Sequence, residues 1–230
     1  MSIHDGHRQR LKERFLTEGL DGFSEVQVLE LLLFYAIPRK DTNPIAHALL
    51  DRFGSLSQVL EAPQEALCEV AGISANSAVL LRLVTEVGRY YLVNRTTKHT
   101  ILSTVDQCAM YMVPFFFGRR TETVFLLCLD AKCKVLCCRE VGEGSVNSAA
   151  VSVRRIVEVA LAANATTVVL AHNHPSGLAI PSEEDIYTTR RVAAALHTVE
   201  ITLADHIVVA DDDYVSMVQS GYRIDDFLRI

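Results

Sequence analysis

The spacing of apolar residues differs between the two halves of the chain. In the first half, apolar side chains recur every three or four positions, which is the period of an amphipathic helix. In the second half, β-branched and apolar residues gather in short runs that alternate with helical stretches. The pattern predicts helices over residues 8–16, 25–36, 42–53 and 74–92. It predicts strands over residues 123–129, 134–140, 166–172 and 200–209.

A polar segment separates the two halves. Residues 93–99 lack periodic apolar side chains, as is typical of a linker. We therefore expect a helical domain over residues 1–95 and a second domain over residues 100–230, in which strands alternate with helices. The expected fold class is α/β, more narrowly α+β, with an all-helical N-terminal domain followed by a mixed β-sheet flanked by helices.

Composition indicates a folded chain that does not enter a membrane. Half of the 230 residues are hydrophobic, which is ample for ordinary cores. No apolar stretch approaches the roughly 20 residues of a membrane helix, and the first residues lack the apolar core of a signal peptide. We therefore expect no membrane partner and a cytoplasmic location.

The six cysteines include no Cys-x-x-Cys pair, and most lie in strand-like apolar sequence. We expect them to be reduced, buried and small hydrophobic side chains. A second metal site at Cys133, Cys137 and Cys138 is the alternative.

Two histidines stand at the end of the third predicted strand. His172 and His174 are two positions apart, and side chains at that spacing in an extended chain point the same way. Asp185 follows in the first turn of a predicted helix that Ser182 would cap. Two imidazoles and one carboxylate leave the fourth position of a tetrahedral zinc ion to water. The sequence therefore predicts a catalytic zinc site at which water becomes a nucleophile at neutral pH.

Each of these residues also has an ordinary explanation. Ser182-x-x-Asp185 is close to a capping box, and an acidic residue in a first helical turn compensates the helix dipole. A single histidine at a strand end is more often not a metal ligand. The His-x-His pair together with the serine and aspartate at this offset favours the metal site over these alternatives.

The combined pattern resembles a known family of metalloproteases. His172-x-His174-Pro175-x6-Ser182-x-x-Asp185 is similar to the JAMM motif, also called MPN+ or JAB, and its surroundings resemble the RadC branch. The likeness covers nearly the whole chain, including Glu122-x-x-Phe125-x-x-x-x-Leu129-Asp130 and Asp205-His206-Ile207-Val208-Val209. It implies an MPN/JAB-like domain and a metallopeptidase or isopeptidase with a peptide or isopeptide substrate. It also implies Zn²⁺ held by His172, His174 and Asp185.

The resemblance also implies a general base, because JAMM enzymes carry a glutamate on an earlier strand that faces the zinc-bound water. In RadC-like chains this glutamate stands four residues before a turn glycine, which assigns the role to Glu140 ahead of Gly144. The residue pattern also favours Glu140, which follows a strand-like run, over Glu143, which lies between two glycines. Glu143 is the competing candidate. The resemblance further implies that Ser182 helps to stabilise the oxyanion of a tetrahedral intermediate, besides capping its helix.

The chain departs from the RadC pattern at one helix entrance. Relatives usually carry Pro-Arg-Glu where this chain has Val153-Arg154-Arg155. The change alters the entrance and a surface that could face substrate, but it does not touch the predicted ligands. Two further histidines, His197 on a helix and His206 in a strand, are expected to be structural.

One segment of the helical half, from Leu67 to Ala78, resembles a helix-hairpin-helix turn, a module that offers backbone amides to nucleic-acid phosphates. Ser74 replaces the second glycine usual in such turns and no lysine follows, so a plain packing turn is the alternative. Residues 1–98 carry 11 basic and 12 acidic side chains, a net charge of −1, whereas DNA affinity requires concentrated positive charge.

Three functions therefore compete. The leading one is a zinc-dependent hydrolase. The second is a DNA-associated repair or recombination protein, whose helical domain makes weak DNA contacts through residues 1–95 and whose zinc domain is regulatory or nucleolytic. The third is a metal-free binding module, which the complete ligand set argues against.

Overall fold

The computed structural model describes residues 3–95, 100–144, 152–175, 177–211 and 213–224. Their contacts divide the chain into two compact units, residues 1–88 and 89–230. The boundary lies within the helix α6 (Ala75–Arg95). The predicted linker covers 93–99, and its residues 96–99 lie outside the described ranges. No helix in these ranges is long and apolar enough to cross a membrane.

The N-terminal unit is all helical, as predicted. Its helices are α1 (Ile3–Glu18), α2 (Glu25–Ala36), α3 (Asn43–Phe53), α4 (Leu56–Glu61), α5 (Gln64–Cys68) and the first part of α6. Ser24 begins α2 with a capping box, and Gly54 ends α3 with a positive φ of 91°, a conformation that glycine adopts without strain. Leucines buried between the helices form the core, among them Leu29, Leu49 and Leu81.

The second unit is a mixed β-sheet with helices on both faces, which confirms the predicted fold class. Its helices are α7 (Val105–Met112), the 3₁₀ turn η1 (Val113–Phe116), α8 (Val153–Ala162) and α9 (Glu183–Thr198). Its strands are β1 (Thr123–Leu129), β2 (Val135–Glu143), β3 (Thr167–Asn173), β4 (Thr202–Ala210) and β5 (Asp213–Ser216). The strand order is β2-β1-β3-β4-β5, with β3 and β4 parallel and the other neighbours antiparallel.

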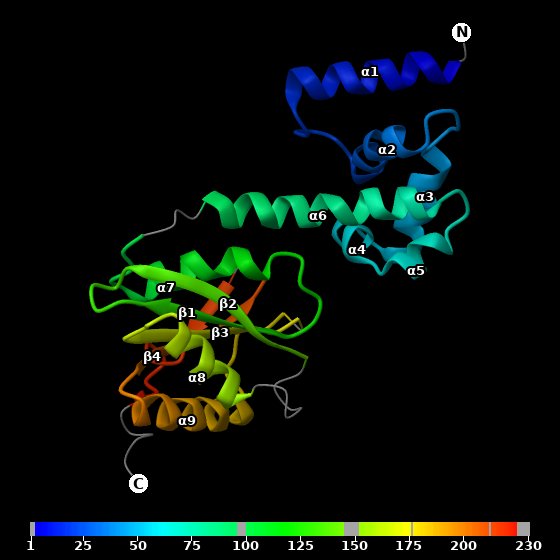
Figure 1. The fold of residues 1–230 in the computed structure, drawn as a ribbon. Helices are drawn as coiled ribbons and strands as arrows, with labels where there is room; N and C mark the ends of the chain where they lie inside the picture. Colours follow the sequence, from blue (N-terminus) through cyan, green and yellow to red (C-terminus); the bar gives the residue numbers. More distant parts are fainter. Residues whose placement is uncertain (1–2, 96–99, 145–151, 176, 212, 225–230) are drawn as a thin grey trace. The chain divides into compact units, whose positions relative to one another are not determined.

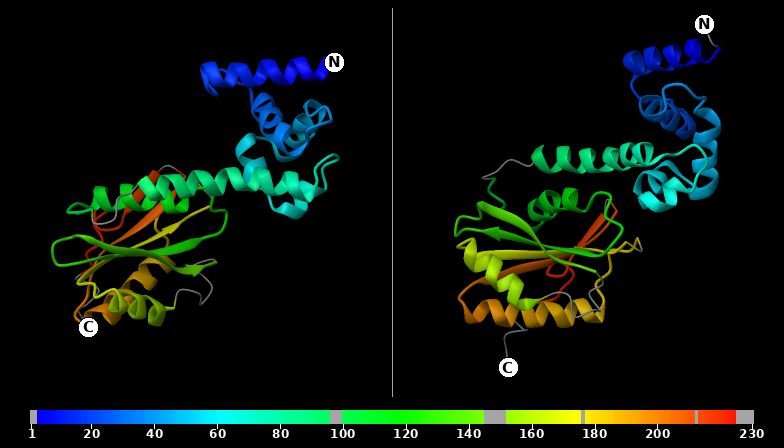
Figure 2. Two further views of the ribbon diagram at one scale, coloured as in Figure 1. Left: turned by 45° about the horizontal axis from the view of Figure 1, so that its top comes forward. Right: turned by 45° about the vertical axis from the view of Figure 1, so that its right-hand side comes forward.

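The alternation of side chains assigns each strand residue to one of two cores. Figures 1 and 2 show α7 on one face of the sheet and α8 with α9 on the other. Phe125 and Val169 belong to the core under α7. Leu126 and Leu170 belong to the core under α8 and α9, with Leu196 of α9. His172 continues the alternation of Leu170, so its side chain lies on the α9 face.

The cysteines match the prediction in part, since two are buried, three are half-buried and one is exposed. All six are free thiols. Cys108 and Cys128 are buried, and burial raises the pKa of the Cys108 thiol to about 11. Cys68 is exposed, contrary to the expectation of burial, because the short helix α5 buries Leu67 and turns its neighbour outward. Within the described ranges, no cysteine belongs to a group of three or more potential metal ligands.

Candidate metal centre

The two histidines are positioned by the continuation of β3. His174 lies one residue beyond the strand, but its amide donates to the Val209 carbonyl oxygen over 2.7 Å, so the pairing with β4 extends past the strand end. The two Nε2 atoms of His172 and His174 lie 2.9 Å apart. His172 is fully buried, whereas 16% of the His174 side chain is exposed. His172 therefore lies at the buried end of the site, and the site reaches solvent at His174.

Asp185 enters the same site from the first turn of α9. Ser182 caps this helix, and both its backbone N–H and its hydroxyl donate to Asp185 Oδ2 over 2.7 Å. Asp185 Oδ1 lies 3.1 Å from His172 Nε2, but this fully buried oxygen makes no hydrogen bond. Burial opposes ionisation of Asp185, but its interactions with His172 and Ser182 prevail and hold its pKa below the usual range. One lone-pair side of a buried carboxylate is therefore left for a cation.

The structure brings the three predicted ligands together. One ligand atom from each of His172, His174 and Asp185 lies within 4.8 Å of the other two. Across the described ranges, this is the only such group of three or more histidine, cysteine or acidic side chains. Two imidazole nitrogens and a carboxylate oxygen suit zinc and leave its fourth position open. The donor set and the unbonded Oδ1 atom both fit a metal ion.

Two buried polar neighbours, Asn173 and His206, adjoin the predicted ligands. Asn173, between the two histidines, accepts a hydrogen bond from the Thr123 amide over 2.8 Å and donates to the Thr121 carbonyl oxygen over 3.2 Å. It thereby fixes the segment that leads into β1 against the end of β3. His206 lies behind His172, and burial, with a smaller electrostatic contribution from His172, holds the pKa of His206 well below its ordinary value. His206 is not among the three potential ligands that lie together in the described ranges.

The structure does not bring Glu140 to these ligands. Glu140 pairs in register with Phe125, a residue of the core under α7, and its Oε2 accepts a hydrogen bond from Arg119 Nη2 over 2.8 Å. The Arg119 guanidinium in turn lies 5.7 Å from the centre of the Phe125 ring. The carboxylate of Glu140 therefore lies on the α7 side of the sheet, opposite the side that His172 faces. The alternative base Glu143 pairs with Thr123, which lies on the same face of β1 as Phe125.

Another glutamate stands one residue before β1, the strand that pairs with β3. β1 runs antiparallel to β3, with Val124 opposite His172. Val124 belongs to the core under α8 and α9, so a residue two positions before it shares its face. That residue is Glu122, and the ladder continues through it because its carbonyl oxygen accepts the Gly144 amide over 2.8 Å. The sequence signal was the even spacing of Glu122, Val124 and Leu126, but it had meaning only once β1 was known to neighbour β3.

The altered helix entrance keeps a normal cap. Ser152 begins α8 and accepts the Arg155 amide on its hydroxyl over 3.3 Å. Arg154 forms an ion pair with Glu158 one turn later, at 2.8 Å. A serine cap therefore serves the entrance where relatives carry proline.

The helix-hairpin-helix-like segment forms α5, a turn and the start of α6. Gly72 in this turn has a φ of 93°, and a Cβ there would lie 2.8 Å from Ile45 Cδ1, so close packing requires glycine. The Ser74 and Ser77 side chains bond to each other and to the amides of these same two residues at the start of α6. This turn is therefore packed and capped by its own side chains.

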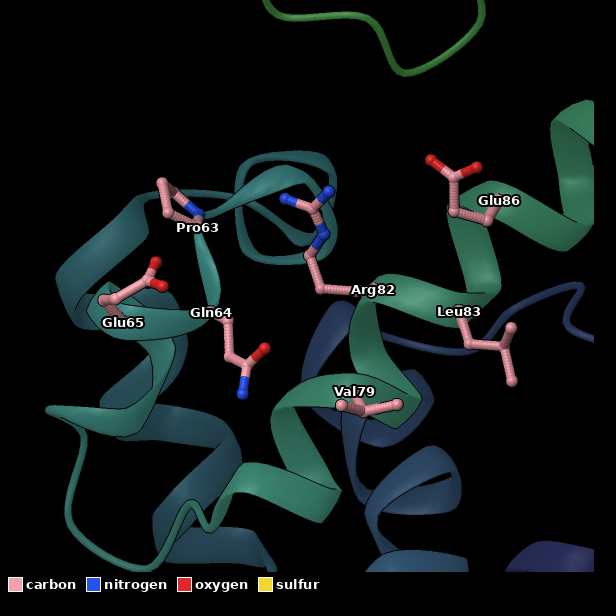
Figure 3. A pocket seen from close by; sticks show the side chains of 7 residues that line it. All are labelled: Pro63, Gln64, Glu65, Val79, Arg82, Leu83 and Glu86. Carbon is pink, nitrogen blue, oxygen red and sulfur yellow. The ribbon is translucent and has the colours of Figure 1, made fainter.

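A cavity of about 440 Å³ lies between α5 and α6. Figure 3 shows the side chains that line it: Pro63, Gln64, Glu65, Val79, Arg82, Leu83 and Glu86. The lining contains no histidine or cysteine, and its guanidinium group donates to the Ala62 carbonyl oxygen over 3.3 Å. It offers no set of reactive groups comparable to the metal centre.

Comparison with known proteins agrees with the motif. The family model of the RadC-like JAB domain matches residues 102–222. The UPF0758 protein SPO0054 of Ruegeria pomeroyi is 35% identical over 94% of this chain and 96% of its own length. The UPF0758 protein FN0909 of Fusobacterium nucleatum subsp. nucleatum is 34% identical over 95% of this chain and 97% of its own length. The chain thus belongs to the RadC family, and its second unit is a RadC-like JAB domain.

Proposed function

We propose that this protein is a zinc-dependent hydrolase of amide bonds, a metallopeptidase or isopeptidase. One observation carries the proposal: the Nε2 atoms of His172 and His174 and the Asp185 carboxylate converge. The Nδ1 atom of His174 lies 3.0 Å from the Leu178 carbonyl oxygen, which can only accept, so the ring proton is on Nδ1 and Nε2 carries a lone pair. That lone pair faces His172 Nε2 and the Asp185 carboxylate. A cation resolves this arrangement.

The proposal assigns metal binding and the orientation of the ligands to residues of this chain. His172, His174 and Asp185 would hold the ion. When bound, zinc acts as a Lewis acid and lowers the pKa of its water ligand to about 7. Ser182 donates its hydroxyl proton to Asp185 Oδ2 and so orients the carboxylate that carries the negative charge. Stabilisation of an oxyanion by Ser182, which the motif suggests, would require this hydroxyl to turn from Asp185 to the substrate.

Two glutamates compete for the role of general base, and the register favours Glu122. A base has to reach the water that attacks the substrate. Counted back from Val124, Glu122 falls on the face of His172, whereas Glu140 lies on the opposite face. We therefore assign proton transfer to Glu122 and retain Glu140 as the alternative that the motif suggests.

The test measures zinc first and cleavage second. We expect about one zinc ion per chain in the wild type and little in His174→Ala after dialysis against metal-free buffer. We expect the wild type to cleave members of a fluorogenic peptide library or isopeptide-linked conjugates. This cleavage should disappear with a chelator, return with zinc and be absent in His174→Ala. Tight zinc binding with no cleavage of any amide substrate would contradict the hydrolase and indicate a non-catalytic centre.

The DNA-associated alternative gains no support from the described residues. The turn before α6 uses its amides within the turn, through Ser74 and Ser77. The net charge of residues 1–98 is −1. No observation on the helical unit therefore favours nucleic acid over the hydrolase reading.

A further inference from the structure

We propose that His206 and Thr189 form a buried positioning clamp that holds His172 in its metal-binding tautomer. The inference rests on the proposed function, since it concerns the same metal centre. Neither residue reaches the substrate side of the site. They contact the ligands from behind, His206 from β4 and Thr189 from α9.

The clamp is a continuous chain of three short hydrogen bonds. His172 Nδ1 lies 2.8 Å from His206 Nε2. His206 Nδ1 lies 2.6 Å from Thr189 Oγ1. Thr189 Oγ1 lies 2.5 Å from the carbonyl oxygen of Asp185, one helical turn earlier. The chain therefore starts on one predicted ligand and ends on the backbone of another.

The direction of these bonds follows from the last of them. The Asp185 carbonyl oxygen can only accept, so the Thr189 hydroxyl donates to it, as threonines in helices often do. Met217 sulfur, 3.5 Å from the same hydroxyl, is a much weaker acceptor. Because the only hydroxyl proton of Thr189 is used in this hydrogen bond, Thr189 Oγ1 accepts a hydrogen bond from His206 Nδ1. His206 Nε2 is then free to accept a proton from His172 Nδ1.

This direction has a consequence for the metal. With its proton on Nδ1, His172 presents the lone pair of Nε2 to the site, where the Nε2 of His174 and Asp185 Oδ1 lie within 3.1 Å. The opposite tautomer would place a proton on Nε2 and prevent coordination. A second partner that fixes the tautomer and ring orientation of a metal-binding histidine typically contributes 10–100-fold to metal affinity.

Both residues of the clamp are buried. Thr189 is fully buried and His206 is 1% exposed, so bulk solvent does not reach either hydrogen-bonding partner. The Asp205 carboxylate accepts the His206 amide over 2.7 Å and the Val218 amide over 3.1 Å. It thereby ties the β4 backbone at His206 to the turn after β5, which fixes the imidazole that supports His172.

The experiment compares pairs of variants that keep size but differ in hydrogen bonding. We expect zinc affinity, measured by competition with a chromophoric chelator, to fall about 10–100-fold in His206→Leu and in Thr189→Val. His206→Gln retains an acceptor and a donor, and Thr189→Ser retains the hydroxyl, so both should stay within about threefold of the wild type. In the wild type, ¹⁵N-resolved imidazole spectra should show His172 protonated at Nδ1.

Each outcome decides a different point. Thermal unfolding of the zinc-free proteins separates a general packing defect from a loss of affinity, and the Thr189 pair serves if His206→Leu does not fold. Equal zinc affinity in Thr189→Val, Thr189→Ser and the wild type would overturn the clamp while leaving the zinc centre intact. A wild type that binds no zinc would refute the proposed function, and the clamp with it.

Discussion

The acidic side chains on the two faces of the sheet differ in burial and in hydrogen-bond partners, near the end of the sheet that carries the candidate metal centre. On the α9 face, Asp185 is fully buried and one of its oxygens makes no hydrogen bond. On the α7 face, the Glu140 side chain is 39% exposed and pairs with Arg119. A cation beside a buried carboxylate that lacks a full set of partners would stabilise its charge, whereas a partly exposed carboxylate with a guanidinium partner is already compensated. Burial and hydrogen-bond partners, rather than charge alone, therefore distinguish the proposed ligand Asp185 from Glu140.

The largest effect is expected from a substitution of Asp185, the buried carboxylate on the α9 face. We expect Asp185→Asn to lose zinc binding, because the amide cannot supply the anionic ligand. Chelation should lower the unfolding temperature of the zinc-loaded wild type, since a ligand present at 100 times its Kd stabilises by about 2.7 kcal/mol. The unfolding temperature of Asp185→Asn should not respond to chelator or to added zinc. Calorimetry with and without chelator makes the measurement.

The matched control lies on the other face. Glu140→Gln removes one negative charge in the same conservative way and should keep the wild-type response to zinc and chelator. If both variants lost the response equally, the contrast between the two faces would be wrong.

The next effect separates the two candidate bases. We expect Glu122→Gln to lower the rate of amide cleavage roughly 100- to 10,000-fold, the range contributed by a general base. Its zinc content should be unchanged, because Glu122 is not among the three ligands. Glu140→Gln should stay within about threefold of the wild-type rate, since its partner Arg119 lies on the α7 side. Steady-state kinetics on one cleaved peptide decides between them.

The reverse result has a clear meaning. A large loss in Glu140→Gln with normal activity in Glu122→Gln would show that the ion pair with Arg119 opens during catalysis. Arg119→Ala would then raise activity rather than leave it unchanged.

Local pattern predicted the parts of the centre that depend only on near neighbours in sequence. The spacing of His172 and His174 at a strand end, and of Asp185 behind a helix cap, was sufficient to predict a shared site. The placement of Glu140 depended on register: irregular pairing between Val124 and Phe125 shifts β2 relative to β1, so strand alternation alone did not identify its face.

Parts of the site that depend on which strands are neighbours could not be predicted. His206 meets His172 because β4 lies beside β3, with Leu170 opposite His206 in a parallel pair. Thr189 reaches His206 because α9 covers that face. The role proposed for Glu122 depends on the pairing of β1 with β3. The spacing of residues in one sequence does not show which strands are neighbours, so these contacts could not be predicted from it.

A moderate effect is expected from a substitution of Ser182, which caps α9 and binds the Asp185 carboxylate. Ser182→Ala removes both the cap of α9 and the hydroxyl bond to Asp185 Oδ2. We expect a loss of about 1 kcal/mol in the free energy of unfolding and roughly tenfold weaker zinc binding. Ser182→Thr keeps the hydroxyl and should restore most of both. Urea unfolding and chelator competition report the two quantities, and unchanged zinc affinity in Ser182→Ala would show that the residue only caps the helix.

The smallest effect tests whether the α7 side is merely a surface ion pair. Arg119→Ala removes the partner of Glu140, and because both side chains are partly exposed we expect the free energy of unfolding to change by no more than about 1 kcal/mol. Zinc affinity should not change, since the guanidinium lies over Phe125 rather than beside the ligands. High salt should shrink the stability difference between wild type and variant, as it screens exposed charges. A loss of zinc binding in Arg119→Ala would instead mean that the two faces are coupled through β1, and that the burial of Asp185 alone does not set the metal affinity.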